Sequence, residues 1–432
     1  DLTDRSNVSG SLKRSEESIG ASYMAKYKGL TFSSLYSETS QGVIGPAIRF
    51  PEDSVFVTKL FTDIGYTQAF KSDWQGQYNL TYNRLIKFVN TNPAIKQAFA
   101  NDYILEATFQ GPLPMDNLSL LIGGSAEHHE GQLVSRNGIR YTSKWYSSYL
   151  QLDYAATDAL RLVAGVQLSK PDEVDAVLSP RLSAIYQINN AWGTKLLYGE
   201  AFRAAYEAER FVSLTNLLGN PSLKPERIAT TDLQLYYHSS DTYAALTYYH
   251  SKMKDIVAKD LVESGSTVQM YINSGEITFD GIEFEGKYNV NENWKAEGSV
   301  SWQENISDTG IKDSTFTANW MVKLGITYDA NTGYQVSLFD SYFGTPSPIS
   351  VVNDAVLEYN PTAKSYHLLT ANINLDLNSL MQLAGATHYE LSFFLDNLLD
   401  EDIHMPEFNR KTVNTLPAHS GRAFYAHLQV TF

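Results

Sequence analysis

The chain has 432 residues, a formal net charge of −15 and no cysteine. The charge argues against a nucleic-acid partner, because phosphate contacts need clustered Lys and Arg. The missing cysteine excludes disulfides and thiolate metal sites, and no run of about 18 apolar residues predicts a transmembrane helix. Aromatic residues make up 12% of the chain, led by 28 Tyr. This side chain suits places where one end is apolar and the other is wet.

Apolar and polar residues alternate with period two along most of the chain. The first such segment, IGASYMAKY, runs into the short turn at Lys28 and Gly29. In WKAEGSVSW, Trp294 and Trp302 share one face with the apolar residues between them. Successive side chains of a strand point to opposite faces, so these segments are predicted to be strands with one apolar side. The last of them ends on Phe432.

Short polar turns alternate with long connections between these predicted strands. A transmembrane β-barrel has this rhythm, because its turns are short at one rim and its loops long at the other. The alternative, a soluble β-sandwich, has no reason to keep it. The short turns lie at 28–29, 71–73, 156–158, 239–241, 289–293 and 329–333, and the long connections at 39–54, 85–101, 127–140, 169–178, 204–226, 254–267, 304–315, 345–364 and 398–420.

The spacing of aromatic residues supports the membrane interpretation. Trp294 and Trp302 are eight residues apart on one face, and so are Phe424 and Phe432. Eight residues span about 27 Å of strand, which at a tilt of about 40° covers about 20 Å of depth, close to the ~25 Å apolar band of such barrels. Asp340 interrupts one apolar face and predicts either a bulge or the end of the lipid-facing stretch.

From the alternation, the rhythm of turns and the aromatic spacing we predict an all-β fold, a transmembrane antiparallel β-barrel.

We count about 19 strands, whereas bacterial single-chain barrels have even strand numbers. The first readable strand runs down into the short turn at 28–29, so it needs an ascending strand before it. Residues 7–14, NVSGSLKR, are the candidate for the end of that strand. We treat 1–432 as a single barrel domain and expect its N-terminal strands to be missing from this chain.

Several segments resemble TonB-dependent outer-membrane receptors. They are LSPRLSAIY at 178–186, YGEAFRAAYEAE at 198–209, GNPSLKPE at 219–226, YINSGEITFDGIEFEG at 271–286, and FFLDNLLDEDI at 393–403 with the closing segment. They follow the family order across the C-terminal two-thirds of the chain, and the first 140 residues match the family only in general pattern. The motif residues are Phe202, Arg203, Asn220, Pro221, Leu223, Lys224, Pro225, Glu226, Gly281, Glu283, Asn397 and Phe432.

The resemblance implies a barrel of the 22-stranded type, with about 19–20 strands in this chain and a plug domain elsewhere. It implies energised uptake of a scarce nutrient across the outer membrane of a Gram-negative bacterium. The ligand would be a small-molecule metal chelate, a ferric siderophore first, then cobalamin, haem or another chelate. TonB, acting through the plug, would be a partner, as would the lipid bilayer and lipopolysaccharide. No enzyme activity and no cofactor are implied.

Two alternatives remain open: a passive porin, and a surface docking or adhesion barrel. A porin would have a complete chain of about 16 to 18 strands. Haem is disfavoured among the ligands, because family haem receptors carry a His between the two central motifs. Here 204–218 has no His, and Ala205 stands at the position of the motif proline.

Structural roles account for most of the central motif. Asn220, Pro221 and Pro225 are expected to set the turn where a long loop returns to its strand. Lys224 and Glu226 are predicted to pair on the inner wall. Candidate ligand contacts, which could also be loop residues that pack on one another, are Arg49, Phe50, Tyr206, Arg210, Phe211, Tyr342, Phe343, Tyr359 and Phe408.

No metal site is assigned, although His128 and His129 are weak candidates in the predicted loop 127–140. Imidazole is a common zinc ligand. Adjacent residues of a strand point in opposite directions, which argues against a shared metal. His404 with Met405 is similarly open.

The terminal Phe432 resembles the C-terminal signal by which outer-membrane barrels are recognised for assembly. Deleting Phe432 is expected to reduce the yield of assembled barrel in the outer membrane. Heat-modifiable migration in gel electrophoresis measures this yield. An unchanged amount of heat-modifiable barrel would contradict the prediction.

Overall fold

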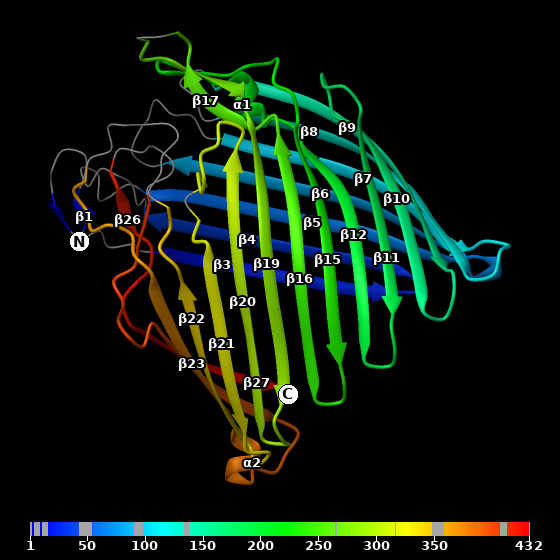
Figure 1. The fold of residues 1–432 in the computed structure, drawn as a ribbon, viewed down its shortest axis with the longest axis vertical. Coiled ribbons are helices and arrows are strands. Elements are labelled where there is room, and N and C mark those ends of the chain that lie inside the picture. The colour runs from blue at the N-terminus through cyan, green and yellow to red at the C-terminus, as the bar shows by residue number, and fades with distance from the viewer. Residues whose placement is uncertain are drawn as a thin grey trace.

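The structure, a computed structural model, describes residues 2–3, 9–10, 16–42, 54–89, 98–133, 138–263, 266–315, 317–347, 358–406 and 413–431. Nineteen long strands form one wall (Figure 1). They are β3 (Glu16–Tyr27), β4 (Leu30–Gly42), β5 (Ser54–Ala69), β6 (Gln75–Val89), β7 (Ala98–Pro112), β8 (Leu118–Gln132), β9 (Arg140–Ala155), β10 (Leu160–Lys170), β11 (Val177–Gln187), β12 (Trp192–Arg203), β15 (Glu226–His238), β16 (Thr242–Lys254), β19 (Glu276–Asn289), β20 (Trp294–Ser307), β21 (Trp320–Asp329), β22 (Tyr334–Phe343), β23 (Tyr366–Asp376), β24 (His388–Asp396) and β27 (Ala423–Thr431).

The wall is an antiparallel barrel in which each strand pairs with the next along the chain. Eighteen antiparallel ladders connect β3 to β27. β27 and β3 are neighbours where the strand order closes, although within the described ranges no register of paired residues joins them. After eighteen antiparallel steps these two strands point the same way. The predicted fold class and the count of about 19 strands are confirmed.

The two rims of the barrel differ as the rhythm of turns predicts. Helix α2 (Leu377–Met381) lies at one end of the wall, and α1 (Glu207–Phe211) with β17 (Val257–Leu261) lies at the other (Figure 1). The single turn of 3-10 helix, η1 (Lys71–Asp73), joins β5 to β6. The end with α1 carries the long loops, so we call it the loop rim, and the other end the turn rim.

Three smaller sheets stand apart from the wall. One contains β13 (Ser213–Leu214), β14 (Leu217–Leu218), β18 (Gln269–Asn273) and β17, and thereby joins two long loops of the loop rim. β25 (His404–Pro406) pairs with β26 (Thr415–Pro417) in the loop between β24 and β27. β1 (Leu2–Thr3) pairs with β2 (Ser9–Gly10).

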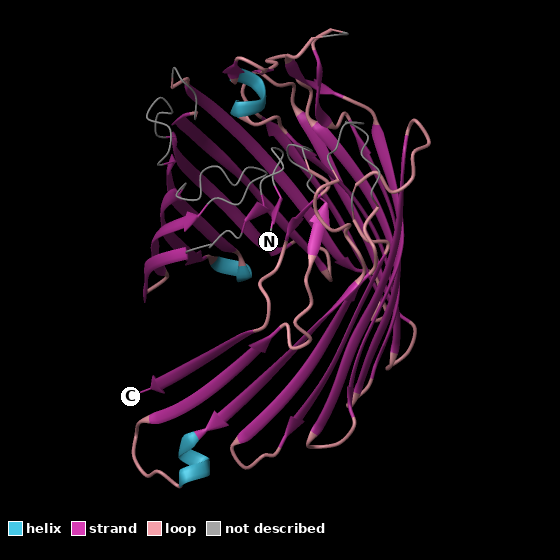
Figure 2. Ribbon diagram, turned by 90° about the vertical axis from the view of Figure 1, so that its left-hand side faces the viewer, coloured by secondary structure: helices cyan, strands magenta, loops and turns pink. Residues whose placement is uncertain are grey.

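Apolar side chains cover one face of the wall. Leu246 of β16, Phe284 of β19 and Leu324 of β21 keep 49%, 48% and 57% of their surface exposed. Side chains on the opposite face are mainly polar, as in the hydrogen-bonded set of Asn79, Thr81 and Asp63. Because an exposed apolar band is stable only against lipid, the apolar face is the outer one. Figure 2 shows the strands of this wall curving together.

Aromatic rings form a belt at each end of the apolar band. At the turn rim Trp192 packs on Tyr237 at 5.1 Å, and Trp294 packs on Tyr328 at 4.8 Å between ring centroids. At the loop rim Trp302 and Trp320 face each other across the β20–β21 ladder. The pairs Tyr82–Tyr103, at 5.1 Å, and Tyr342–His367, at 4.9 Å, belong to this belt at the loop rim, which we call the outer aromatic belt. Trp294 and Trp302 therefore lie at the two edges of the apolar band, as their eight-residue spacing predicts.

Asp340 lies at the outer belt, and its ladder with β21 continues without a bulge. Its carboxylate contacts His367 at 2.8 Å. The predicted bulge is therefore wrong, and the other alternative, the end of the lipid-facing stretch, stays a prediction.

Several predictions of strand limits were wrong. Of the candidate strand end at 7–14 the structure describes Ser9 and Gly10, which pair with Thr3 and Leu2 and not with a strand of the wall. About half of the predicted loop at 85–101 is strand, because β6 continues to Val89 and β7 begins at Ala98. Half of the predicted loop at 127–140 is also strand, because β8 continues to Gln132 and β9 begins at Arg140. The polar side chains of this stretch bond across the ladder, which extends the wall beyond the membrane. Phe432 lies outside the described residues, and no helix in the described ranges is long and apolar enough to cross a membrane.

Replacing Phe284 by Arg should destabilise the barrel by about 2–4 kcal/mol, because it places a charge against the middle of the bilayer. Urea unfolding of the refolded chain in lipid vesicles measures this change. Glu283→Arg is the matched control: this neighbour lies on the polar face and should cost much less. Equal losses for both variants would contradict the assignment of faces.

Candidate functional site

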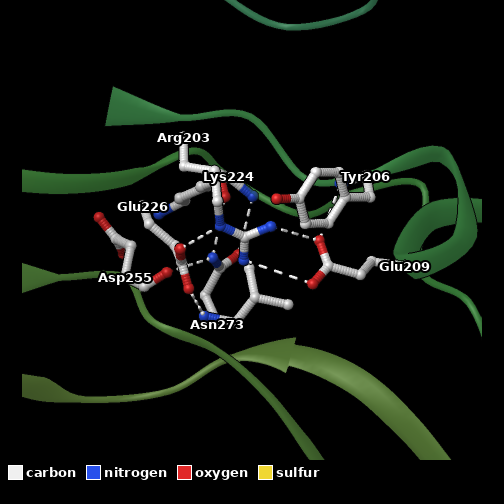
Figure 3. A network of polar contacts seen from close by, with 8 residues as sticks. Arg203, Tyr206, Glu209, Lys224, Glu226, Asp255 and Asn273 are labelled. Carbon is white, nitrogen blue, oxygen red and sulfur yellow. Dashed lines mark hydrogen bonds and ion pairs between the residues drawn. The ribbon is translucent and has the colours of Figure 1, made fainter. Parts of the chain in front are cut away.

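The loop rim is organised around Arg203, the last residue of β12. Arg203 pairs in register with Glu226, the first residue of β15. Its guanidinium Nε donates a hydrogen bond to Glu226, and its Nη1 donates to Glu209 of α1 at 2.8 Å. Figure 3 shows the guanidinium between the two carboxylates. One cation therefore ties the end of one strand, the start of the next and the helix between them.

Backbone groups and an aromatic ring complete this arrangement. Glu226 accepts a second hydrogen bond from the backbone N–H of Val257, at 2.6 Å, which brings β17 to the same point. The backbone N–H of Tyr206 donates to Glu209 at 2.8 Å, and the Arg203 guanidinium lies 4.8 Å from the Tyr206 ring centroid. A cation over an aromatic face is attracted by the ring. We call Arg203, Glu209 and Glu226 the arginine clamp.

The motif segment 219–226 fixes the returning loop by hydrogen bonds to β18. The Asn220 side chain donates to the Tyr271 carbonyl at 3.0 Å and accepts from the Ser222 N–H at 2.9 Å. Asn273 accepts from the Lys224 N–H at 2.7 Å and donates to the Lys224 carbonyl at 2.9 Å. Nearby, Leu223 is buried. These contacts support a structural role for the motif.

The predicted pairing of Lys224 with Glu226 is wrong. Glu226 is occupied by Arg203 and by the Val257 N–H. Residues two apart share a face only when both are in a strand. Lys224 lies in the turn before β15, and its backbone N–H and carbonyl bond to Asn273. Glu226 pairs instead with Arg203, its neighbour across the β12–β15 ladder, and the spacing of residues along the sequence does not show this neighbour.

Arg210 and Phe211 lie on α1. Arg210 is 5% exposed, donates to Glu173 at 2.5 Å and lies 3.7 Å from Glu207. Its guanidinium lies 4.8 Å from the centroid of the Phe211 ring. Burial raises the pKa of Glu207, and Arg210 partly offsets this shift. Arg210 therefore holds α1 against the β10–β11 loop, and its predicted contact with a ligand stays a prediction.

A cavity of about 450 Å³ lies where α1 and the end of β12 meet the inner face of β7, β8 and β9. Its lining includes Asp102, Glu127, His129, Tyr141, Ser143, Trp145, Arg203, Tyr206 and Glu207. We call it the acidic cavity. His129 contacts Asp102 at 2.7 Å through Nδ1 and Glu127 at 3.2 Å through Nε2.

The two adjacent histidines point in opposite directions, as strand geometry predicts. The His128 ring lies 6.1 Å from Tyr103 in the outer aromatic belt, whereas His129 lies beyond that belt and faces the cavity. Hydrogen bonds to Asp102 and Glu127 raise the pKa of His129 to about 9, so it is protonated at neutral pH. Within the described part of the chain no group of three or more acidic, His or Cys residues could hold a metal.

A second cavity of about 410 Å³ lies at the loop rim of β20–β23. Phe343 and Tyr366 stack at 5.0 Å in its wall, and Met321 and Met405 add apolar surface. We call it the apolar cavity. The neighbouring Tyr342 points outward to His367 instead. Of the candidate ligand contacts, the structure therefore places Phe343 and Tyr206 at cavities.

The remaining predicted residues have other positions. Tyr359 is exposed beside the buried Asn360, and His404 is buried at the start of β25. Arg49, Phe50 and Phe408 lie outside the described residues. Of the other motif residues, Gly281 has no room for a side chain, because an added Cβ would lie 2.3 Å from the Tyr249 ring. Neighbouring Glu283 faces the interior, and Phe202 also borders the acidic cavity.

Asn397 organises the loop after β24. It is fully buried, has a positive φ of 48°, donates to the carbonyls of Glu401 and Ser420, and accepts from the Glu401 N–H. Asn adopts this left-handed conformation more readily than most residues. The predicted family motif at this position is thus a folded loop corner.

Sequence reasoning missed several lining residues of both cavities: Asp102, Glu127, Tyr141, Ser143, Trp145, Met321 and Tyr366. One signal was present, because Glu127 and His129 are two apart and so share a strand face. Asp102 is 27 residues away from His129 and meets it only through the β7–β8 register.

Comparison with known proteins identifies the family. The family model described as "TonB dependent receptor-like, beta-barrel" matches residues 4–398. The chain belongs to this family. The match begins within the first 140 residues, where the motifs gave no specific signal. Chains of this family lie in the outer membrane of Gram-negative bacteria, so the predicted localisation is confirmed.

Two curated relatives match this chain over part of their own length. It is 21% identical over 395 residues to an iron-regulated outer membrane virulence protein of Vibrio cholerae, with 84% of this chain and 56% of the relative covered. It is 25% identical over 286 residues to the vitamin B12 transporter BtuB of Vibrio cholerae, with 63% and 40% covered. The chain thus spans about half the length of the curated relatives it matches.

Solved structures share the fold. The siderophore receptor PirA of Acinetobacter baumannii matches with a TM-score of 0.75 at 13% identity, covering 96% of this chain and 70% of that one. A ferric enterobactin receptor mutant of Pseudomonas aeruginosa, PfeA in complex with enterobactin, gives 0.76 at 13% identity over the same shares. The copper transporter OprC gives 0.73 at 13% identity, covering 99% and 76%.

Replacing Arg203 by Ala should loosen the 204–225 loop, because it leaves the buried Glu226 carboxylate without its cation. We expect a local cost of about 2 kcal/mol, low in the range for a broken pair because Arg203 is partly exposed. Limited proteolysis of whole cells measures opening of this loop. Lys224→Ala is the control, and equal cleavage of both variants would contradict the clamp.

Proposed function

We propose that the protein is an outer-membrane receptor that takes up a scarce metal chelate, a ferric siderophore first, by TonB-energised transport. The observation that carries this proposal is the pair of cavities at the loop rim of a barrel of this family. Both combine aromatic surface with a few polar groups, which suits ligand binding. The names of relatives and structural neighbours, an iron-regulated protein and siderophore receptors, support iron chelates as the first class.

Several parts of this proposal concern more than the described chain. TonB would act through a plug domain, which the family resemblance implies. Lipopolysaccharide and lipid would contact the outer aromatic belt and the apolar face. Uptake moves a ligand without breaking its bonds, so we assign a transport protein and not an enzyme. A passive porin is disfavoured by the family, and a role as a docking surface can coexist with transport.

Cobalamin is the second candidate ligand. The apolar cavity supports it, because Phe343, Tyr366, Met321 and Met405 offer a surface for a flat apolar ring system. A curated relative that carries the name vitamin B12 transporter supports the same choice. Uptake of labelled cyanocobalamin by the same cells distinguishes the two ligand classes.

The test uses the protein as its host encodes it. Iron starvation should induce it, and deleting its gene should reduce uptake of at least one radiolabelled ferric siderophore. Uptake should also stop when TonB is deleted or the proton-motive force is collapsed. Uptake that persists in both conditions would indicate passive diffusion and overturn the proposal. Expression indifferent to iron would count against the siderophore class.

One substitution connects transport to the apolar cavity. Phe343→Ala should weaken ligand binding about tenfold, because a well-placed aromatic contact contributes on this scale. Tyr342→Ala is the matched control, since the neighbouring ring points outward to His367. Saturation binding to whole cells measures both, and equal affinities for the two variants would exclude the apolar cavity.

A further inference from the structure

The acidic cavity has more carboxylates around it than cations. Its lining and the ion-pair partners of that lining contain three cations, His129, Arg203 and Arg210. Against them stand five carboxylates: Asp102, Glu127, Glu207, Glu209 and Glu226. A partly enclosed site with this excess attracts positive charge and repels anions.

The two cations that line the cavity are already engaged. Both ring nitrogens of His129 contact carboxylates, Asp102 at one end and Glu127 at the other. Arg203 is held between Glu209 and Glu226 in the arginine clamp. A strongly anionic ligand would need free Arg or Lys donors, and within the described lining these two offer none that is uncompensated.

Aromatic faces surround the same space. Tyr141 and Trp145 come from β9, and Tyr206 lies at the start of α1. The Trp145 ring lies edge-on to His129 at 5.8 Å, and the Tyr206 ring already holds one cation on its face, the Arg203 guanidinium. Aromatic walls together with carboxylates recognise ammonium groups in proteins.

Ser143 supplies an independent indication of a ligand. It lies in the lining, is 4% exposed, and pairs with His129 across the β8–β9 ladder. Its hydroxyl has no hydrogen-bond partner in the residues that the structure describes. Buried polar groups rarely stay unpaired, because each costs about 1–3 kcal/mol. A ligand N–H donor in the cavity would satisfy this oxygen.

We propose that the acidic cavity binds a protonated amine carried by the metal chelate, so that the receptor prefers cationic chelates to neutral or anionic ones. This inference rests on the proposed uptake function. Asp102, Glu127 and Glu207 provide the negative charge, Trp145 and Tyr206 provide the aromatic faces, and Ser143 accepts a hydrogen bond.

The experiment compares chelates that differ mainly in charge. Ferrioxamine B is a ferric trihydroxamate with one free ammonium group, and N-acetylation makes it neutral without changing its iron centre. A ferric tris-catecholate serves as the anionic probe. Binding of each to the full protein in outer-membrane vesicles gives the affinities. We expect the ammonium form to bind about tenfold more tightly than the acetylated form, the ratio expected of one desolvated cation contact.

Two variants locate the preference. Glu207→Gln and Ser143→Ala should each reduce the ratio several-fold, because each weakens binding of the ammonium form more than binding of the acetylated form. Glu283→Gln, which removes an interior carboxylate from β19 outside this cavity, should leave the ratio as it is. Because Ser143→Ala removes one oxygen and no charge, its effect distinguishes a direct hydrogen bond to the ligand from the long-range electrostatic attraction of the carboxylates.

The outcomes are distinct. Equal binding of the two trihydroxamates, or tighter binding of the tris-catecholate, would overturn the amine site but leave uptake of chelates intact. A charge preference that survives Glu207→Gln and Ser143→Ala would also overturn it, because the preference would then arise elsewhere. If none of the chelates binds and none is taken up, the proposed function itself fails, and the amine site with it.

Discussion

The constraint on which the whole structure depends is that backbone N–H and C=O groups need partners in a medium without water. Eighteen antiparallel ladders supply those partners along the wall. Once backbone pairing is satisfied within the sheet, the two faces can differ freely. One face carries Leu, Phe and Ile against lipid, and the other carries polar groups against the interior.

The wall also continues past the membrane, which creates the functional end of the molecule. β8 extends through Gln132, beyond His128 in the outer aromatic belt, and β12 ends at Arg203 where the loops begin. Beyond the outer aromatic belt, loops fold back over the inward-facing residues of the wall. The arginine clamp and the segment 219–226 hold one such loop in place.

The two cavities at this end differ in chemistry although both are partly aromatic. The apolar cavity stacks Phe343 on Tyr366 beside methionine side chains and suits a neutral, flat surface. In the acidic cavity, carboxylates contact both ring nitrogens of His129, and the buried Ser143 hydroxyl has no hydrogen-bond partner among the described residues. A chelate with an apolar body and a charged amine would find complementary chemistry at one rim of the barrel.

The class of fold could be predicted from the amino-acid pattern alone, because period-two alternation, the rhythm of turns and the eight-residue spacing of Trp294 and Trp302 are local properties of strands in a membrane. The same pattern predicts that His128 and His129 face opposite ways. The pattern could not predict that Glu226 pairs with Arg203 and not with Lys224, or that Asp102 and Ser143 lie next to His129. These contacts depend on the register between strands and on how loops fold over the rim, neither of which is expressed in the spacing of residues along one strand.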